Sequence, residues 1–169
     1  NFYTTTIYEK GAEIIRMLEL LLGQKEFMRG INVYFENFDG SAATTEDFIN
    51  SIIKGAYLEE NPPFDVDKFY NWYYKPGTPK VYINQSWDAN NSILNVSFEQ
   101  KLNSSSTEKN IEMVIPILYS CYSSENLGKT IVEEDLFVLD KKKKSLKINT
   151  LTGDKKAPVL SIFRRFSAP

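Results

Sequence analysis

Lys75-Pro76-Gly77-Thr78-Pro79 marks the point at which the hydrophobic pattern of this 169-residue chain changes. Two prolines and a glycine within five residues stop a helix and favour an extended or turning backbone. The apolar residues before this stretch have a helical period, and those after it have the period of β-strands. We therefore expect two domains, a helical part at residues 1–77 and a strand-rich part at residues 78–169.

The helical part shows apolar residues that recur at intervals of three and four, the spacing of one helix face. A first such set ends before Gly23 and a second before Gly40, so both glycines stand where helices are expected to end. Thr44, with Asp47 three residues later, predicts the capped start of a third helix. A shorter fourth helix is expected after Asp65.

The strand-rich part is expected to hold six short strands separated by polar turns. They are predicted at residues 81–83, 93–98, 111–122, 136–139, 146–148 and 159–166. Strict alternation from Ile111 to Cys121 predicts that one face of the third strand is buried. The lysine run at 141–144 is expected to form a hairpin connection between the fourth and fifth strands. The predicted fold class is α+β: a helical bundle followed by an immunoglobulin-like antiparallel β-sandwich.

Composition excludes several function classes. A formal net charge of -2 and a pI near 5.3 provide no basic face for nucleic acid, although a phosphate or nucleic-acid patch at the lysine run is the alternative to a solvated connection. No apolar run reaches the ~20 residues that span a bilayer, so no membrane interaction is expected. Cys121 has no partner within the chain, and a reducing, cytoplasmic location is therefore expected.

No metal site is expected from the carboxylate groups at 59–60, 65–67 and 133–135. They lack the regular oxygen-ligand spacing of a calcium loop, and the chain has no histidine at all. Solvated surface is the preferred interpretation. The absence of an initiator methionine at Asn1 and the stop at Pro169 after a hydrophobic segment lead us to expect that both ends are internal to a longer polypeptide.

A resemblance to a known family comes from the segment Thr5-Thr6-Ile7-Tyr8-Glu9-Lys10-Gly11-Ala12-Glu13. It resembles the catalytic-tyrosine segment of the aminopeptidase N family of zinc peptidases. Other stretches match that family's pattern in order: Asn1-Phe2-Tyr3, residues 39–44, Trp72-Tyr73, Gly77-Thr78-Pro79 and Phe166-Ser167-Ala168-Pro169. The resemblance implies that the helical part is the end of a thermolysin-like catalytic domain and that the strands form the small β-sandwich domain after it.

The same resemblance implies a function. The parent protein would be a zinc-dependent aminopeptidase that removes N-terminal amino acids from peptides, with peptide substrates and the remaining domains of the same polypeptide as its partners. Tyr8 would be the catalytic residue that donates a hydrogen bond to the oxygen of the tetrahedral intermediate, and Tyr3 would help to bind the first side chain of the substrate. The family's H-E-x-x-H helix and G-x-M-E-N loop are absent from this sequence. We therefore expect these 169 residues to bind no zinc and to be inactive alone.

Several alternatives remain at this stage. The chain could belong to a noncatalytic member of the superfamily, or it could be a helix-plus-sandwich module for protein interaction. A related zinc enzyme that acts on a lipid epoxide is disfavoured because that branch lacks such a sandwich. Tyr8 could instead be an aromatic anchor at a helix start, and Tyr3 could be a buried loop aromatic.

Overall fold

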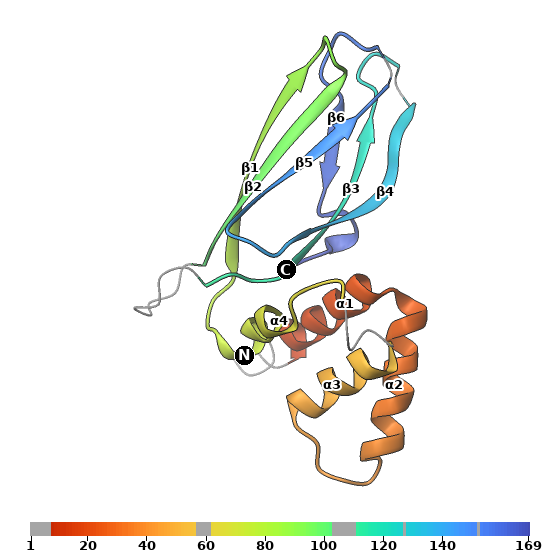
Figure 1. Ribbon diagram of the computed structural model, residues 1–169, viewed down its shortest axis with the longest axis vertical. Helices are drawn as coiled ribbons and strands as arrows, with labels where there is room; N and C mark the ends of the chain where they lie inside the picture. The colour runs from red at the N-terminus through yellow and green to blue at the C-terminus, as the bar shows by residue number, and fades with distance from the viewer. Residues whose placement is uncertain (1–7, 57–61, 103–110, 127, 152) are drawn as a thin grey trace. The chain divides into compact units, whose positions relative to one another are not determined.

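The computed structural model describes residues 8–56, 62–102, 111–126, 128–151 and 153–169, and it shows helices followed by antiparallel sheets (Figure 1). The helices are α1 (Lys10–Leu22), α2 (Gln24–Phe38), α3 (Thr45–Gly55) and α4 (Val66–Tyr74). The strands are β1 (Pro79–Asp88), β2 (Ile93–Leu102), β3 (Ile115–Tyr122), β4 (Thr130–Leu139), β5 (Lys143–Asn149) and β6 (Val159–Ile162), and a 3₁₀ turn follows at Arg164–Phe166. The predicted fold class is confirmed.

The chain divides into two compact units, residues 1–66 and 67–169, and each is described by itself. In the first unit, Gly23 separates α1 from α2 with a φ of 84°, a conformation that glycine adopts without strain. Thr44 and Asp47 form the predicted capping box at the start of α3: the Thr44 hydroxyl accepts from the Asp47 amide at 3.1 Å, and the Asp47 carboxylate accepts from the Thr44 amide at 2.9 Å. Both sequence predictions are confirmed.

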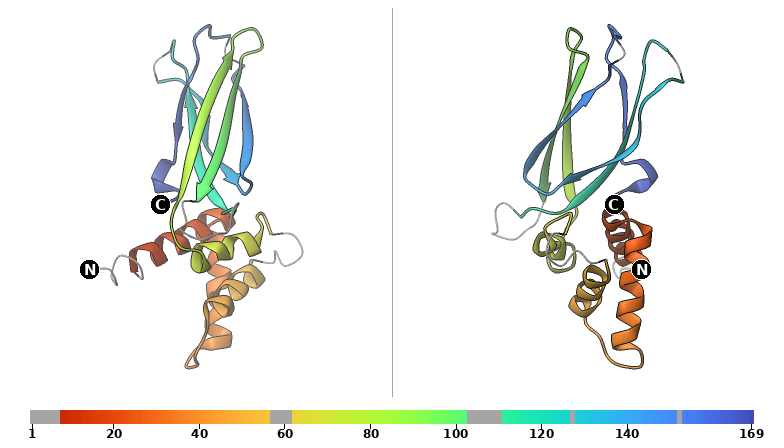
Figure 2. Two further views of the ribbon diagram at one scale, coloured as in Figure 1. Left: turned by 90° about the vertical axis from the view of Figure 1, so that its left-hand side faces the viewer. Right: turned by 45° about the vertical axis from the view of Figure 1, so that its right-hand side comes forward.

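α2 and α3 lie side by side (Figure 2) because small residues face each other between them. Gly30 of α2 and Gly55 of α3 bring the two backbones into contact. Near the other ends of these helices, Tyr34 stacks on Phe38 and meets the ring of Phe48 edge to face, with centroids 5.6 and 5.1 Å apart. The α2–α3 pair is therefore held by backbone contact at one end and by aromatic packing at the other.

The second unit is a sandwich of two three-stranded antiparallel sheets, in the orders β1-β2-β5 and β4-β3-β6 (Figures 1 and 2). Its core is made by apolar side chains of both sheets, with Leu94, Val96 and Phe98 on β2 and Ile115 and Ile117 on β3 almost completely buried. All residues of β3 from 115 to 121 are buried, so this central strand is covered on both faces, beyond the single buried face that alternation predicts.

All six predicted strands differ from the observed ones in at least one bound: β1, β2, β4 and β5 are longer than predicted, and β3 and β6 are shorter. The third strand begins at Ile115 instead of residue 111. The backbone of Met113 is bonded to the Gln100 side chain and not to a neighbouring strand: its N–H donates to Gln100 Oε1 at 2.8 Å, and its C=O accepts from Gln100 Nε2 at 2.9 Å. The last strand ends at Ile162, because Phe163, Arg165 and Phe166 have left-handed backbones with a φ of 51°.

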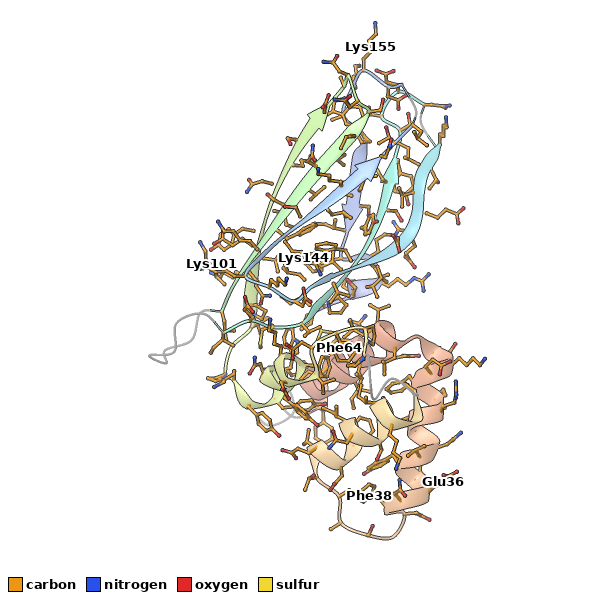
Figure 3. All side chains as sticks on the ribbon, in the orientation of Figure 1. Glu36, Phe38, Phe64, Lys101, Lys144 and Lys155 are labelled. Atoms are coloured by element: carbon orange, nitrogen blue, oxygen red, sulfur yellow. The ribbon has the colours of Figure 1, made fainter. Side chains whose placement is uncertain are left out.

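A further error concerns the lysine run. β4 and β5 belong to different sheets, so residues 140–142 cross from one sheet to the other and do not close a hairpin. Lys143 and Lys144 lie within β5. The ammonium of Lys144, which is labelled in Figure 3, donates to the Val138 carbonyl at 2.8 Å and to the Asp140 carboxylate at 2.9 Å. Part of the run therefore neutralises charge at the edge of the sandwich and is not simply solvated.

α4 packs within the second unit, against the end of the sandwich. The buried indole of Trp72 donates to the Val114 carbonyl at 2.8 Å, and the Asn71 amide donates to the Glu112 carbonyl at 2.9 Å. The predicted helix after Asp65 is thus present, and its apolar face, with Phe69 and Trp72, is buried.

Candidate functional site

Tyr8 lies two residues before the regular part of α1, which begins at Lys10. Residues 8 and 9 form a π-helical turn, and Glu9 already has helical backbone angles (φ -71°, ψ -53°). The helix that follows buries Ile14, Met17 and Leu18 on one side, which fixes its direction. Tyr8 is therefore attached to an element held by packing, and this is the kind of support that a positioned donor requires.

The Tyr8 side chain is 64% exposed in this chain. The choice between a catalytic role and an aromatic anchor at a helix start stays open for Tyr8. The phenol carries one O–H donor on a ring with few rotors. Tyr3 lies outside the described residues, so its role in substrate binding stays a prediction.

The residues that the structure describes do not fit a zinc ion. The sequence contains no histidine, and no group of three His, Cys, Asp or Glu side chains within the described ranges could hold a metal. The thiol of Cys121 is buried in β3, and this burial raises its pKa, which disfavours the thiolate that zinc requires. The described side chains therefore provide no ligand set for a catalytic metal.

The acidic cluster at 133–135 contacts neighbouring side chains. Glu134 forms ion pairs with Arg164, at 3.2 Å, and with Arg165. Asp135 accepts a hydrogen bond from the Tyr119 hydroxyl at 2.9 Å. Burial is the largest cause, and this carboxylate the second, of a rise in the pKa of Tyr119 to about 12. A tyrosine with such a pKa stays protonated, so the pair is structural and not an acid–base couple at neutral pH.

Sequence reasoning missed a polar network that holds α4 on the sandwich. Lys68 donates to the Glu112 carboxylate at 2.7 Å and to the Asp140 carbonyl at 3.0 Å, and Glu112 also accepts from the Lys142 amide at 2.8 Å. These hydrogen bonds lower the pKa of Glu112, and the bond from Lys68 has the largest effect. The partners are 30 to 72 residues apart in the chain, so no local sequence signal could have shown them.

Comparison with known families matches almost the whole chain. Residues 1–73 match the model of the peptidase family M1 domain. Residues 77–169 match a domain of unknown function, DUF3458, which is described as having an Ig-like fold. The chain belongs to the aminopeptidase N family of M1 peptidases. The resemblance that begins at Tyr8 is thereby confirmed.

Similar proteins agree with this family. Aminopeptidase N of Escherichia coli strain K12 is 36% identical over 132 residues, which are 78% of this chain and 14% of that protein. Aminopeptidase N of Haemophilus influenzae is 29% identical over all of this chain and 19% of its own length. Among solved structures, aminopeptidase A of Legionella pneumophila in complex with aspartic acid superposes with a TM-score of 0.80 at 27% identity, over 98% of this chain and 17% of that one.

This M1-family chain thus spans less than one fifth of the length of these curated relatives. None of the helices in the described part of the chain has the length and apolar character needed to cross a membrane.

Proposed function

We propose that these 169 residues are part of a zinc-dependent aminopeptidase that removes N-terminal amino acids from peptides. The observation that carries the proposal is the match of residues 1–73, which include Tyr8, to the M1 peptidase domain. Because no side-chain group in the described residues fits zinc, the metal would be held by other parts of the complete polypeptide. The isolated chain would then be inactive.

The role proposed for Tyr8 follows from the chemistry of a phenol. Attack on a peptide carbonyl places negative charge on its oxygen, and a fixed neutral donor aimed at that oxygen lowers the barrier. A phenol supplies one O–H donor on a ring with few rotors, so it suits this task. Tyr3, five residues earlier, is proposed to line the pocket for the first side chain of the substrate. We also propose that the part belonging to the catalytic domain ends at residue 77.

We further propose a cytoplasmic location and no membrane or nucleic-acid partner. Cys121 is a free, buried thiol, which a reducing compartment preserves, and the net charge is -2. The partners of the complete protein would be peptide substrates and the remaining domains of its own polypeptide.

Replacement of Tyr8 by Phe in the complete polypeptide tests the proposal. Loss of one oxyanion donor is expected to lower kcat by roughly 10²–10³ with little change in KM. Tyr82→Phe, the same chemical change at an exposed position of β1, is the matched control and should leave kcat unchanged. Unchanged turnover in Tyr8→Phe would rule out this role.

The alternative is a noncatalytic member of the family that acts by protein interaction. The same preparation separates the two, because a complete polypeptide with no metal-dependent cleavage of an aminoacyl-arylamide would support the noncatalytic alternative. Cleavage by residues 1–169 alone would contradict the proposal that the metal site lies elsewhere.

A further inference from the structure

The helix α4 belongs to one part of the chain by sequence and to the other part by packing. The M1 peptidase domain matches residues 1–73 and so includes nearly all of α4, whereas the match to the Ig-like domain begins at residue 77. The compact units divide elsewhere, since residues 1–66 form one unit and residues 67–169 the other. The boundary between the two families therefore falls inside a compact unit, and α4 is the element that the two divisions assign differently.

α4 has little helical stability of its own. It is nine residues long, which is below the about 12–15 residues at which an isolated helix becomes marginally stable in water. Apart from Lys68, its residues are aromatic, β-branched, Asp or Asn, and all of these form helices less readily than Ala, Leu or Lys. The helical state of α4 therefore depends on its tertiary contacts.

Three side chains of α4 donate hydrogen bonds to the segment that precedes β3. The Asn71 amide donates to the Glu112 carbonyl at 2.9 Å, and the Trp72 indole donates to the Val114 carbonyl at 2.8 Å. Lys68 donates to the Glu112 carboxylate at 2.7 Å. Two of the three acceptors are backbone carbonyls, so α4 is bonded to the main chain of the sandwich as well as to a side chain.

Residues 111–114 are bonded to two different partners in alternation. The N–H and C=O of Met113 are bonded to the Gln100 side chain, whereas the carbonyls of the residues on either side of Met113 accept from α4. α4 therefore occupies the place that a neighbouring strand would take beside this segment. If α4 were to leave, these two carbonyls would lose their donors, and the one at Val114 is buried.

We propose that α4 and the sandwich form one cooperative unit, so that the helix at the end of the peptidase-domain match is folded and held by the Ig-like domain. Cooperative units of this kind open together and are defined by contacts, not by sequence families. Residues 75–78 connect α4 to β1, and the Lys75 amide donates to the Asn71 carbonyl at 2.9 Å. Any movement of the sandwich then carries α4 with it. The proposal concerns how the two domains are joined and does not depend on the enzymatic function.

Hydrogen exchange of the complete polypeptide, followed by mass spectrometry of peptides from α2–α3, α4 and β3, tests the proposal. Ile117→Val removes one methyl group from the fully buried core of the sandwich, and this is expected to speed exchange through opening of the sandwich roughly 2- to 12-fold. Exchange in α4 should rise by the same factor as in β3, because the two open together. Exchange in α2 and α3 should not change.

Gly30→Ala is the matched change in the first unit. It adds one methyl group where α2 and α3 are in backbone contact, and it should speed exchange in these two helices roughly 5- to 150-fold without an effect on α4. Trp72→Phe tests the coupling in the reverse direction. It removes the donor to the Val114 carbonyl, so it should speed exchange in α4 and β3 together and leave α2 and α3 unchanged.

The three variants decide the question together. Exchange in α4 that rises with that of β3 in Ile117→Val and in Trp72→Phe, and that is unaffected by Gly30→Ala, supports the proposal. Exchange in α4 that follows Gly30→Ala overturns it, because α4 would then open with the first unit. Exchange in α4 that Ile117→Val leaves unchanged overturns it too, since α4 would then open on its own. Faster exchange everywhere in every variant would show a single unit, which also contradicts the proposal.

Discussion

Gly30 and Gly55 lie backbone against backbone where α2 packs on α3. A Cβ atom on Gly30 would lie 2.6 Å from the carbonyl oxygen of Ile52, and one on Gly55 would lie 2.6 Å from the amide nitrogen of Gly30. Real Cβ atoms essentially never approach this closely, so the two helices could not keep their distance with any other residue at either position. Glycine is required here for space, since both residues lie within helices.

Gly30→Ala and Gly55→Ala are each expected to lower the free energy of unfolding by about 1–3 kcal/mol, the cost of inserting a methyl group into a packed site. Gly11→Ala is the matched control. It is also helical, but nothing lies within 4 Å of its Cβ position, so this change should stabilise by up to about 0.5–1 kcal/mol. Urea denaturation followed by circular dichroism measures all three, and equal effects at positions 11 and 30 would contradict the close approach.

Trp72→Phe is expected to lower the free energy of unfolding by about 1–3 kcal/mol, because the buried carbonyl of Val114 loses its donor. Trp87→Phe removes a similar bond, to the Lys155 carbonyl at 3.1 Å, but in an exposed place where water can replace the indole. Its cost should be correspondingly smaller. Thermal denaturation of the two variants makes the comparison. A larger loss in Trp87→Phe would contradict the anchoring of α4 by Trp72.

Sequence patterns predicted the elements whose causes are local. Gly23 ends a helix because of its own backbone freedom, and Thr44 with Asp47 caps the next through bonds that span three residues. The change of period at residues 75–79 likewise reports a local change of backbone. Each of these features depends only on residues that are close in the sequence, so the sequence alone was sufficient to predict it.

Features that depend on distant partners could not be predicted in the same way. Residues 111–114 have the alternation of a strand, but their backbone partner is the side chain of Gln100. The lysines at 141–144 would look the same in a hairpin and in a crossing between sheets. The candidate site shows the same limit: the segment around Tyr8 is recognisable by its resemblance to the family, whereas the described residues contain no group of side chains that could hold a metal.

Gln100→Met is expected to destabilise the sandwich by about 1–3 kcal/mol. The substitution keeps the length of the side chain but leaves the buried N–H and C=O of Met113 without the partners they have at 2.8 and 2.9 Å. Gln85→Met, the same change at an exposed position of β1, should alter stability by less than about 0.5 kcal/mol. Chemical denaturation compares the two. If both variants are equally stable, the Gln100 amide does not hold the edge of the core.

Glu112 gives the stability of the second unit a dependence on acid pH. Hydrogen bonds from Lys68 and from the Lys142 amide lower the pKa of this carboxyl below its usual 4.5 in the folded chain. The unfolded chain therefore binds a proton at a higher pH than the folded one, so the contribution of Glu112 is complete above about 4.5 and is lost as the pH falls through the folded-state pKa.

Glu112→Gln should accordingly be less stable than the unaltered chain at neutral pH, and the difference should shrink as the pH is lowered. Lys68→Met should show a weaker version of the same change, because the bond from the Lys142 amide remains. Denaturation midpoints measured from neutral to acid pH provide the comparison. A stability difference for Glu112→Gln that stays constant over this range would show that the carboxylate has no preference for the folded state.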